Sequence, residues 1–198
     1  MTTEIRLGLD ARHKDEFIRL FCDAFPEIIV PVFGSIERCA RLLERSLAND
    51  RILTAISGDR LVGFAGLHYS RREWFDPSLP QLLNSMRWGI FRVMAVGIVL
   101  FKRPKFDVLH LDTLAVQPDM RGQGIGTQLV DAVVALANAE GKCFVTLEVE
   151  DINPRAERLY ERLGFVVDKF EKLPWPWSTR FPFSGSYFMR KTLTQSEP

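Results

Sequence analysis

Hydrophobic positions along the chain repeat with a period near two in some segments and near 3.6 in others, which is typical of a domain that contains both strands and helices. The longer period predicts helices, which we place at 13–25, 35–47, 124–140 and 154–163. The shorter period predicts strands, which we place at 5–9, 51–57, 60–69, 107–116, 143–150, 165–170 and 185–191. Hairpins followed by strand–helix–strand–helix–strand predict an α/β fold with a mixed sheet.

Residues 70–106 interrupt this alternation as a long insert between two predicted strands. Within it, residues 81–101 are mostly apolar but include Arg87 and Arg92, and a membrane-spanning helix needs about 20 apolar residues in a row. We therefore expect a helix that covers the fold, a cleft or a partner. Basic residues at 102, 103 and 105 also suit an interfacial helix, so peripheral membrane contact through 81–105 stays open as an alternative.

Length and composition narrow the class of protein. A chain of 198 residues suits a single domain, which we expect to span 1–198. A formal net charge of +1 gives no global excess of basic residues for nucleic acid, so we expect no nucleic-acid partner. Three cysteines at irregular spacing argue against a disulfide framework. The cysteine pattern and an N-terminal segment without the apolar core of a signal peptide predict a cytoplasmic protein.

The most informative segment is the glycine-rich turn between the strand 107–116 and the helix 124–140. Gly122, Gly124 and Gly126 alternate there and leave backbone N–H groups unobstructed at the start of a helix. Such N–H groups and the helix dipole favour an anion, above all a phosphate or diphosphate. Arg121 adds a full positive charge beside them.

Three kinds of phosphate-binding loop are candidates for this turn. The P-loop pattern fails because no Lys follows the last glycine. The dinucleotide pattern GxGxxG also fails, because its third glycine would fall on Thr127 or Leu129, although Glu148 lies at the spacing of its acidic residue. The pattern that fits is Arg-x-x-Gly-x-Gly over residues 121–126.

A second motif runs from Asn153 to Phe165. Asn153 suits a helix N-cap, Pro154 the first helical position and Gly164 the exit, and Tyr160 lies on the apolar stripe. Taken with the glycine-rich turn, the pattern Asn-x-x-Ala-x-x-x-Tyr-x-x-x-Gly-Phe resembles the GCN5-related N-acetyltransferases (GNAT). The resemblance is strong over 107–170, and it implies a mostly antiparallel, twisted sheet with flanking helices and the insert 70–106.

The resemblance also implies a function, namely transfer of an acetyl group from acetyl-CoA, as co-substrate and without a metal, to a primary amine of a small molecule or peptide. It implies that the loop binds the diphosphate, that the helix 154–163 borders the pantetheine arm, and that the strand before the loop donates a backbone N–H to the reacting oxygen. The cofactor-binding residues are then Leu114, Ala115, Val116, Arg121, Gly122, Gln123, Gly124, Ile125, Gly126, Thr127, Asn153, Ala156 and Tyr160.

The chemistry needs a base for the incoming ammonium and a proton donor for the leaving thiolate. Tyr160, with an ordinary pKa of about 10, would be neutral and able to donate. Alternation along its strand puts Glu148 on the face opposite the core, where it serves either as the base or as a rim carboxylate paired with an arginine. Asp112 and His110 share a face of the preceding strand and form a second candidate for the base, with a packed core histidine as the alternative for His110.

Two further questions stay open at the level of sequence. Basic residues in the insert and the aromatic residues of 174–177 and 180–183 suggest an apolar or aromatic acceptor, or else they close the edge of the core or a homodimer interface. The alternative to an enzyme is a non-catalytic acyl-CoA-binding sensor or regulatory module. It would keep the loop and dispense with the base.

Overall fold

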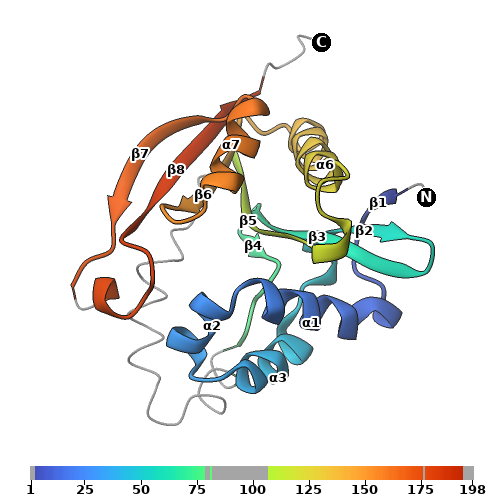
Figure 1. Ribbon diagram of the computed structural model, residues 1–198. Coiled ribbons are helices and arrows are strands. Elements are labelled where there is room, and N and C mark those ends of the chain that lie inside the picture. Colours follow the sequence, from blue (N-terminus) through green and yellow to red (C-terminus); the bar gives the residue numbers. More distant parts are fainter. Residues whose placement is uncertain (1–2, 79–80, 82–106, 176, 194–198) are drawn as a thin grey trace.

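The computed structural model describes residues 3–78, 81, 107–175 and 177–193, and its centre is an eight-stranded sheet (Figure 1). The sheet order is β1-β2-β3-β5-β6-β8-β7, with β4 beside β3. β5 and β6 run parallel, and the other neighbouring pairs of the described sheet are antiparallel. The strands are β1 (Thr3–Leu7), β2 (Ile52–Ser57), β3 (Arg60–Tyr69), β4 (Arg72–Glu73), β5 (Val108–Val116), β6 (Phe144–Glu150), β7 (Val166–Lys172) and β8 (Gly185–Thr192).

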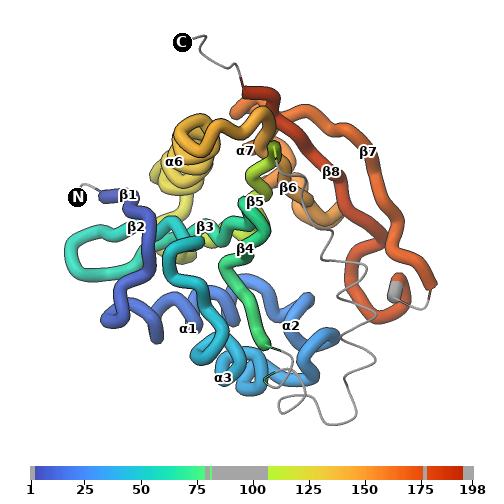
Figure 2. Tube along the Cα trace, turned by 180° about the vertical axis from the view of Figure 1, so that it is seen from behind, coloured from blue at the N-terminus to red at the C-terminus, as the bar shows by residue number. Residues whose placement is uncertain are grey.

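Helices cover the two faces of the sheet unevenly. Figures 1 and 2 show three helices below the β1–β3 half, α1 (Lys14–Ala24), α2 (Pro26–Phe33) and α3 (Ile36–Ser46). Two further helices of the described part of the chain lie on the opposite side, α6 (Ile125–Ala139) and α7 (Pro154–Arg162). Short 3₁₀ turns complete the described chain: η1 (Ala11–His13), η2 (Asn49–Arg51), η3 (Pro118–Met120) and η4 (Trp177–Thr179).

Each helical layer has its own hydrophobic core. Between α1–α3 and the sheet, the rings of Phe17 and Phe64 lie 4.4 Å apart at their centroids, and both side chains are fully buried. On the other face, Leu129 and Val133 of α6 pack with Leu109, Leu111 and the buried stripe of β6. The spacing i, i+3, i+4 on α1 and α6 produces these buried faces directly.

The predicted architecture, a mixed and mostly antiparallel sheet with flanking helices, is confirmed. Outside the insert, the predicted helices and strands are present, and their ends differ by at most two residues. The helix α2 was missed, because Pro31 interrupts its sequence pattern. Pro26 at its first turn and Gly34 at its C-cap, with φ of 84°, define its ends.

Several expectations concern the insert 70–106. The helix expected over 81–101 and the alternative of membrane contact through 81–105 lie outside the described residues, apart from Gln81. Among the residues that are described, no helix combines the length and the apolar character that a membrane crossing needs. The single-domain boundaries and the cytoplasmic location stay predictions.

The aromatic segment near the C-terminus divides into two parts. Phe181 and Phe183 are buried and pair with each other, with ring centroids 5.2 Å apart. Trp175, by contrast, is 80% exposed. The two phenylalanines therefore form a buried pair, and Trp175 is not part of it.

Candidate active site

The two parallel strands at the centre of the sheet separate at one end. Their ladder runs from Val108 opposite Phe144 to Leu111 opposite Leu147 and stops there. β5 nevertheless continues to Val116 and β6 to Glu150. β5 keeps its pairing with β3 as far as Val116, through a register shift next to Gly66. The edge of β5 that faces β6 therefore carries backbone N–H and C=O groups outside the ladder between the strands.

The glycine-rich loop closes the wide end of this opening. Gly122 and Gly124 both have φ of 80°, a left-handed conformation that glycine adopts without a steric penalty. Gly124 is the N-cap of α6, so the first amides of the helix point out of the loop. Arg121 is tied back to the strand, because its Nε donates a hydrogen bond of 3.1 Å to the carbonyl oxygen of Val116. The loop thus has the geometry of an anion site at a helix N-terminus.

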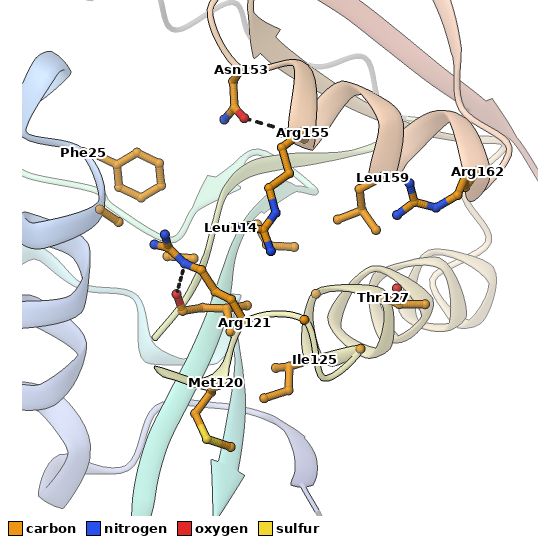
Figure 3. A pocket seen from close by; sticks show the side chains of 17 residues that line it. Phe25, Leu114, Met120, Arg121, Ile125, Thr127, Asn153, Arg155, Leu159 and Arg162 are labelled. Carbon is orange, nitrogen blue, oxygen red and sulfur yellow. Dashed lines mark hydrogen bonds between the residues drawn. The ribbon is translucent and has the colours of Figure 1, made fainter. Parts of the chain in front are cut away.

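A cavity of about 540 Å³ lies between the loop, the free end of β5 and α7 (Figure 3). Its 17 lining residues include three arginines and no Asp or Glu. The lining residues are Ala24, Phe25, Leu114, Ala115, Val116, Met120, Arg121, Gly122, Gly124, Ile125, Gly126, Thr127, Asn153, Arg155, Ala156, Leu159 and Arg162. A long anionic ligand with an apolar section fits this combination of charge and aliphatic surface.

The wall opposite the loop is the start of α7. Asn153 caps the helix as predicted, since its Oδ1 accepts a hydrogen bond of 3.2 Å from the amide of Ala156. Ala156 and Leu159 then face the cavity. Figure 3 shows α7 and the N-terminal part of α6 on either side of the space, with Leu159 between them.

Tyr160 does not line the cavity, although the sequence placed it with the cofactor-binding residues. It is buried against Phe165, with ring centroids 5.7 Å apart in an edge-on arrangement. Burial, and after it the charge of Glu150, raises the pKa of Tyr160 above its ordinary value. Its hydroxyl therefore stays protonated at neutral pH.

Two carboxylates lie where β5 and β6 begin to separate. Asp112 and Glu148 are the first residues of their strands beyond the parallel ladder. Asp112 accepts a hydrogen bond of 2.8 Å from the indole Nε1 of Trp74, and Nε2 of His110 lies 3.5 Å from its other oxygen. Burial lowers the pKa of His110 and Asp112 offsets part of that effect, so the imidazole is neutral at pH 7. Its Nδ1 lies 2.9 Å from the hydroxyl of Thr146.

Glu150, at the end of β6, is a further titratable group at this end of the sheet, and no sequence motif assigns it a role. Burial raises the pKa of its carboxyl, a backbone hydrogen bond offsets part of this effect, and the charges of Glu27 and Asp151 add to it. The charge of Glu150 in turn acts on Tyr160. The alternation that singled out Glu148 places Glu150 on the same face, which is the one sequence signal that could have identified it.

The structure brings most of the predicted binding residues together. Eleven of the thirteen line one cavity. The exceptions are Tyr160 and Gln123, whose side-chain amide turns back to the carbonyl oxygen of Asp119 at 3.4 Å. The catalytic candidates Glu148 and Asp112 do not line the cavity either. Within the described residues, no three His, Cys, Asp or Glu side chains gather in a way that could hold a metal ion.

The chain is similar to acetyltransferases both as a family and as individual proteins. Residues 15–165 match the acetyltransferase (GNAT) family. The chain is 30% identical over 113 residues to an uncharacterised N-acetyltransferase of Methanocaldococcus jannaschii, an alignment that spans 52% of this chain and 50% of the relative. It is also 48% identical over 61 residues to N-alpha-acetyltransferase 30 of Xenopus laevis, which spans 30% of this chain and 22% of that protein. The chain thus matches half or less of the length of these relatives.

Structural comparison extends the likeness to the whole chain. An aminoglycoside 6′-N-acetyltransferase solved in complex with coenzyme A superposes with a TM-score of 0.63 and covers all of both chains. Its sequence identity is 16%, so this likeness concerns the fold.

Proposed function

The chain belongs to the acetyltransferase (GNAT) family, and from this premise we propose that it transfers the acetyl group of acetyl-CoA to a primary amine of a small molecule or peptide by direct attack on the thioester. The observation that carries the proposal is the opening between β5 and β6, with the glycine-rich loop at its wide end and two carboxylates at its narrow end. A ligand held at the loop by its diphosphate would extend along this opening toward Asp112 and Glu148.

The cavity fits coenzyme A in shape and charge. Loop amides and three arginines match phosphate groups, and the carboxylate-free lining avoids repulsion. Leu114, Ala156 and Leu159 provide an aliphatic surface for the uncharged pantetheine arm. When bound, acetyl-CoA supplies the activated acetyl group, and the residues of this chain orient it and move the protons.

We assign three roles in the chemistry. Glu148 takes the proton of the incoming ammonium, with Asp112 as the second candidate for this role. Tyr160 donates a proton to the thiolate of coenzyme A as it leaves. The backbone N–H groups on the free edge of β5, around Leu114 to Val116, stabilise negative charge on the acetyl oxygen.

Replacing Tyr160 by Phe removes the hydroxyl and keeps the ring against Phe165. We expect kcat to fall by about 10²–10⁴-fold, the usual contribution of a general acid, with little change in KM for acetyl-CoA. Steady-state kinetics of the pure variant measure both constants. An unchanged kcat would remove Tyr160 from the acid role, and the matched Phe165→Leu variant reports what loss of packing alone does.

The pH dependence of kcat/KM distinguishes the candidate bases. A base works only when it is deprotonated, so the rate falls as the pH drops through its pKa. Burial raises the pKa of Glu150. If Glu150 were the base, the rate would therefore fall at a pH above the ordinary glutamate pKa of about 4.3. We expect Glu148→Gln to abolish the acid limb and Glu150→Gln to retain it, although shifted. The opposite result would transfer the role to Glu150, and a limb unchanged in both variants would leave Asp112.

Turnover separates an enzyme from a sensor that only binds acyl-CoA. We expect the protein to release free thiol from acetyl-CoA in the presence of a suitable amine, with a panel that includes peptides with free N-termini, peptidyl lysines and small amines. Affinity for acetyl-CoA by calorimetry without thiol release over the whole panel would favour the sensor. An absence of affinity for coenzyme A in folded protein would contradict both.

A further inference from the structure

The cavity holds more positive charge than a diphosphate needs. Besides Arg121 of the loop, Arg155 and Arg162 of α7 line the space, and neither belongs to the patterns that identify the family above. These two residues stand seven positions apart, so they share one face of the helix, about 10 Å apart along its axis. Two phosphate groups separated by a comparable distance would match them better than one.

The two arginines of α7 differ in their place relative to the loop. Figure 3 shows Arg155 extending from the first turn of α7 toward the loop, where Arg121 also lies. Arg162 lies at the last turn of α7, near Leu159 and on the side of Thr127 of α6. A diphosphate on the loop amides is within the range of Arg121 and Arg155, and Arg162 lies at the other end of the wall.

Arg162 has no competing partner among the residues that the structure describes. The ion pairs found there use Arg6, Arg12, Arg51, Arg60, Arg72 and Arg190, and no carboxylate lines the cavity. Its neighbour Arg158 is also exposed but does not line the cavity, so the same helix carries a matched arginine that faces elsewhere. The guanidinium of Arg162 is therefore free to bind an anion from the cavity.

We propose that Arg162 binds the 3′-phosphate of coenzyme A and makes the protein discriminate against acyl carriers that lack it. This inference rests on the proposed function, since it takes coenzyme A as the ligand. Coenzyme A carries its third phosphate on the ribose, on the far side of the diphosphate from the pantetheine arm. With the diphosphate on the loop and the arm in the opening between β5 and β6, the ribose phosphate is directed to the end of the cavity where Arg162 lies.

Calorimetry with coenzyme A and with 3′-dephospho-coenzyme A tests this assignment without relying on catalysis. We expect the wild type to bind coenzyme A about tenfold more tightly than the dephospho form. Arg162→Gln should lower the affinity for coenzyme A by about the same factor and change the affinity for the dephospho form by no more than about twofold. The preference for coenzyme A then disappears. Arg158→Gln should keep the preference, and Arg162→Lys should keep part of it, because the charge remains but the planar fork is lost.

Other outcomes have distinct meanings. If Arg162→Gln lowers the affinity for both ligands equally, the residue binds the diphosphate and the assignment is wrong. If it changes neither, or if the wild type shows no preference, Arg162 makes no contact with the 3′-phosphate and the assignment is again wrong, although the proposed function stands. Failure of the folded wild type to bind either ligand would overturn the proposed function itself. Near-ultraviolet circular dichroism confirms that each variant is folded.

Discussion

Replacing Gly126 by Asp is expected to abolish the binding of acetyl-CoA and leave the protein folded. Gly126 is the second residue of α6 and lines the cavity. A Cβ at this position would meet nothing closer than Leu159 Cδ2 at 3.5 Å, with Leu114 Cδ2 at 4.0 Å, so the backbone accepts a side chain. The new carboxylate would then stand beside the amides that we assign to the diphosphate. Repulsion at this range should raise Kd on the order of 100-fold or more.

Gly126→Asp should keep or increase the stability of the protein while it abolishes binding, so the two effects can be told apart. Glycine is a poor helix former, and a carboxylate in the first turn interacts favourably with the helix dipole. We therefore expect a melting temperature equal to or above that of the wild type, with binding lost. Calorimetry and thermal unfolding measure the two effects separately.

The matched control for Gly126→Asp is Gly126→Asn, which adds the same volume without the charge. We expect Gly126→Asn to raise the Kd for acetyl-CoA by about tenfold, which is well below the increase expected for Gly126→Asp. Equal losses in both variants would show that bulk alone acts and that no phosphate lies near residue 126. Unchanged affinity in Gly126→Asp would remove the loop from the binding site altogether.

Local sequence signals were sufficient for the parts of the site that depend on backbone conformation. The alternating glycines form the turn at the start of α6, where Gly122 and Gly124 have positive φ, and Asn153 caps α7 through its side chain as predicted. These outcomes depend on residues within a few positions of one another. The same locality explains why the helices and strands were predicted with small errors at their ends.

Features that depend on contacts between distant segments were not predictable. The extra arginines of the cavity, Arg155 and Arg162, look like ordinary solvent-exposed charges of an amphipathic helix until the position of α7 over the loop is known. Likewise, nothing in the local sequence of Phe25 indicates that the end of α1 forms a cavity wall. The hydrogen bond from Trp74 to Asp112 joins residues 38 positions apart. Tertiary packing decides all three.

Replacing Phe64 by Ala is expected to give the largest loss of stability among single substitutions in the α1–α3 layer. Phe64 is fully buried on β3, and its ring contacts Phe17 at 4.4 Å and Phe21 at 6.3 Å between centroids. Removing a ring from such a site leaves a cavity that rigid neighbours fill only in part. We expect the free energy of unfolding to fall by about 3–5 kcal/mol, measured by urea denaturation.

The control for Phe64→Ala is Phe170→Ala on the edge strand β7. Phe170 is 38% exposed and its ring pairs with Tyr187 at 4.9 Å, so its removal should cost about 1–2 kcal/mol. If both variants lose the same free energy of unfolding, the buried aromatic cluster contributes no more to stability than a half-exposed ring does.

The Phe64 variant should also affect the active site, because the aromatic cluster is continuous with the cavity wall. Phe21 contacts Phe64 on one side and Phe25 on the other, with centroids 5.2 Å apart in the second pair, and Phe25 lines the cavity. Loss of Phe64 frees Phe21 and thereby the end of α1. We expect KM for acetyl-CoA to rise several-fold in Phe64→Ala at a temperature where the variant is still folded, and to stay unchanged in Phe170→Ala. An unchanged KM in both variants would show that the position of Phe25 is fixed by α2 and the loop rather than by the core beneath it.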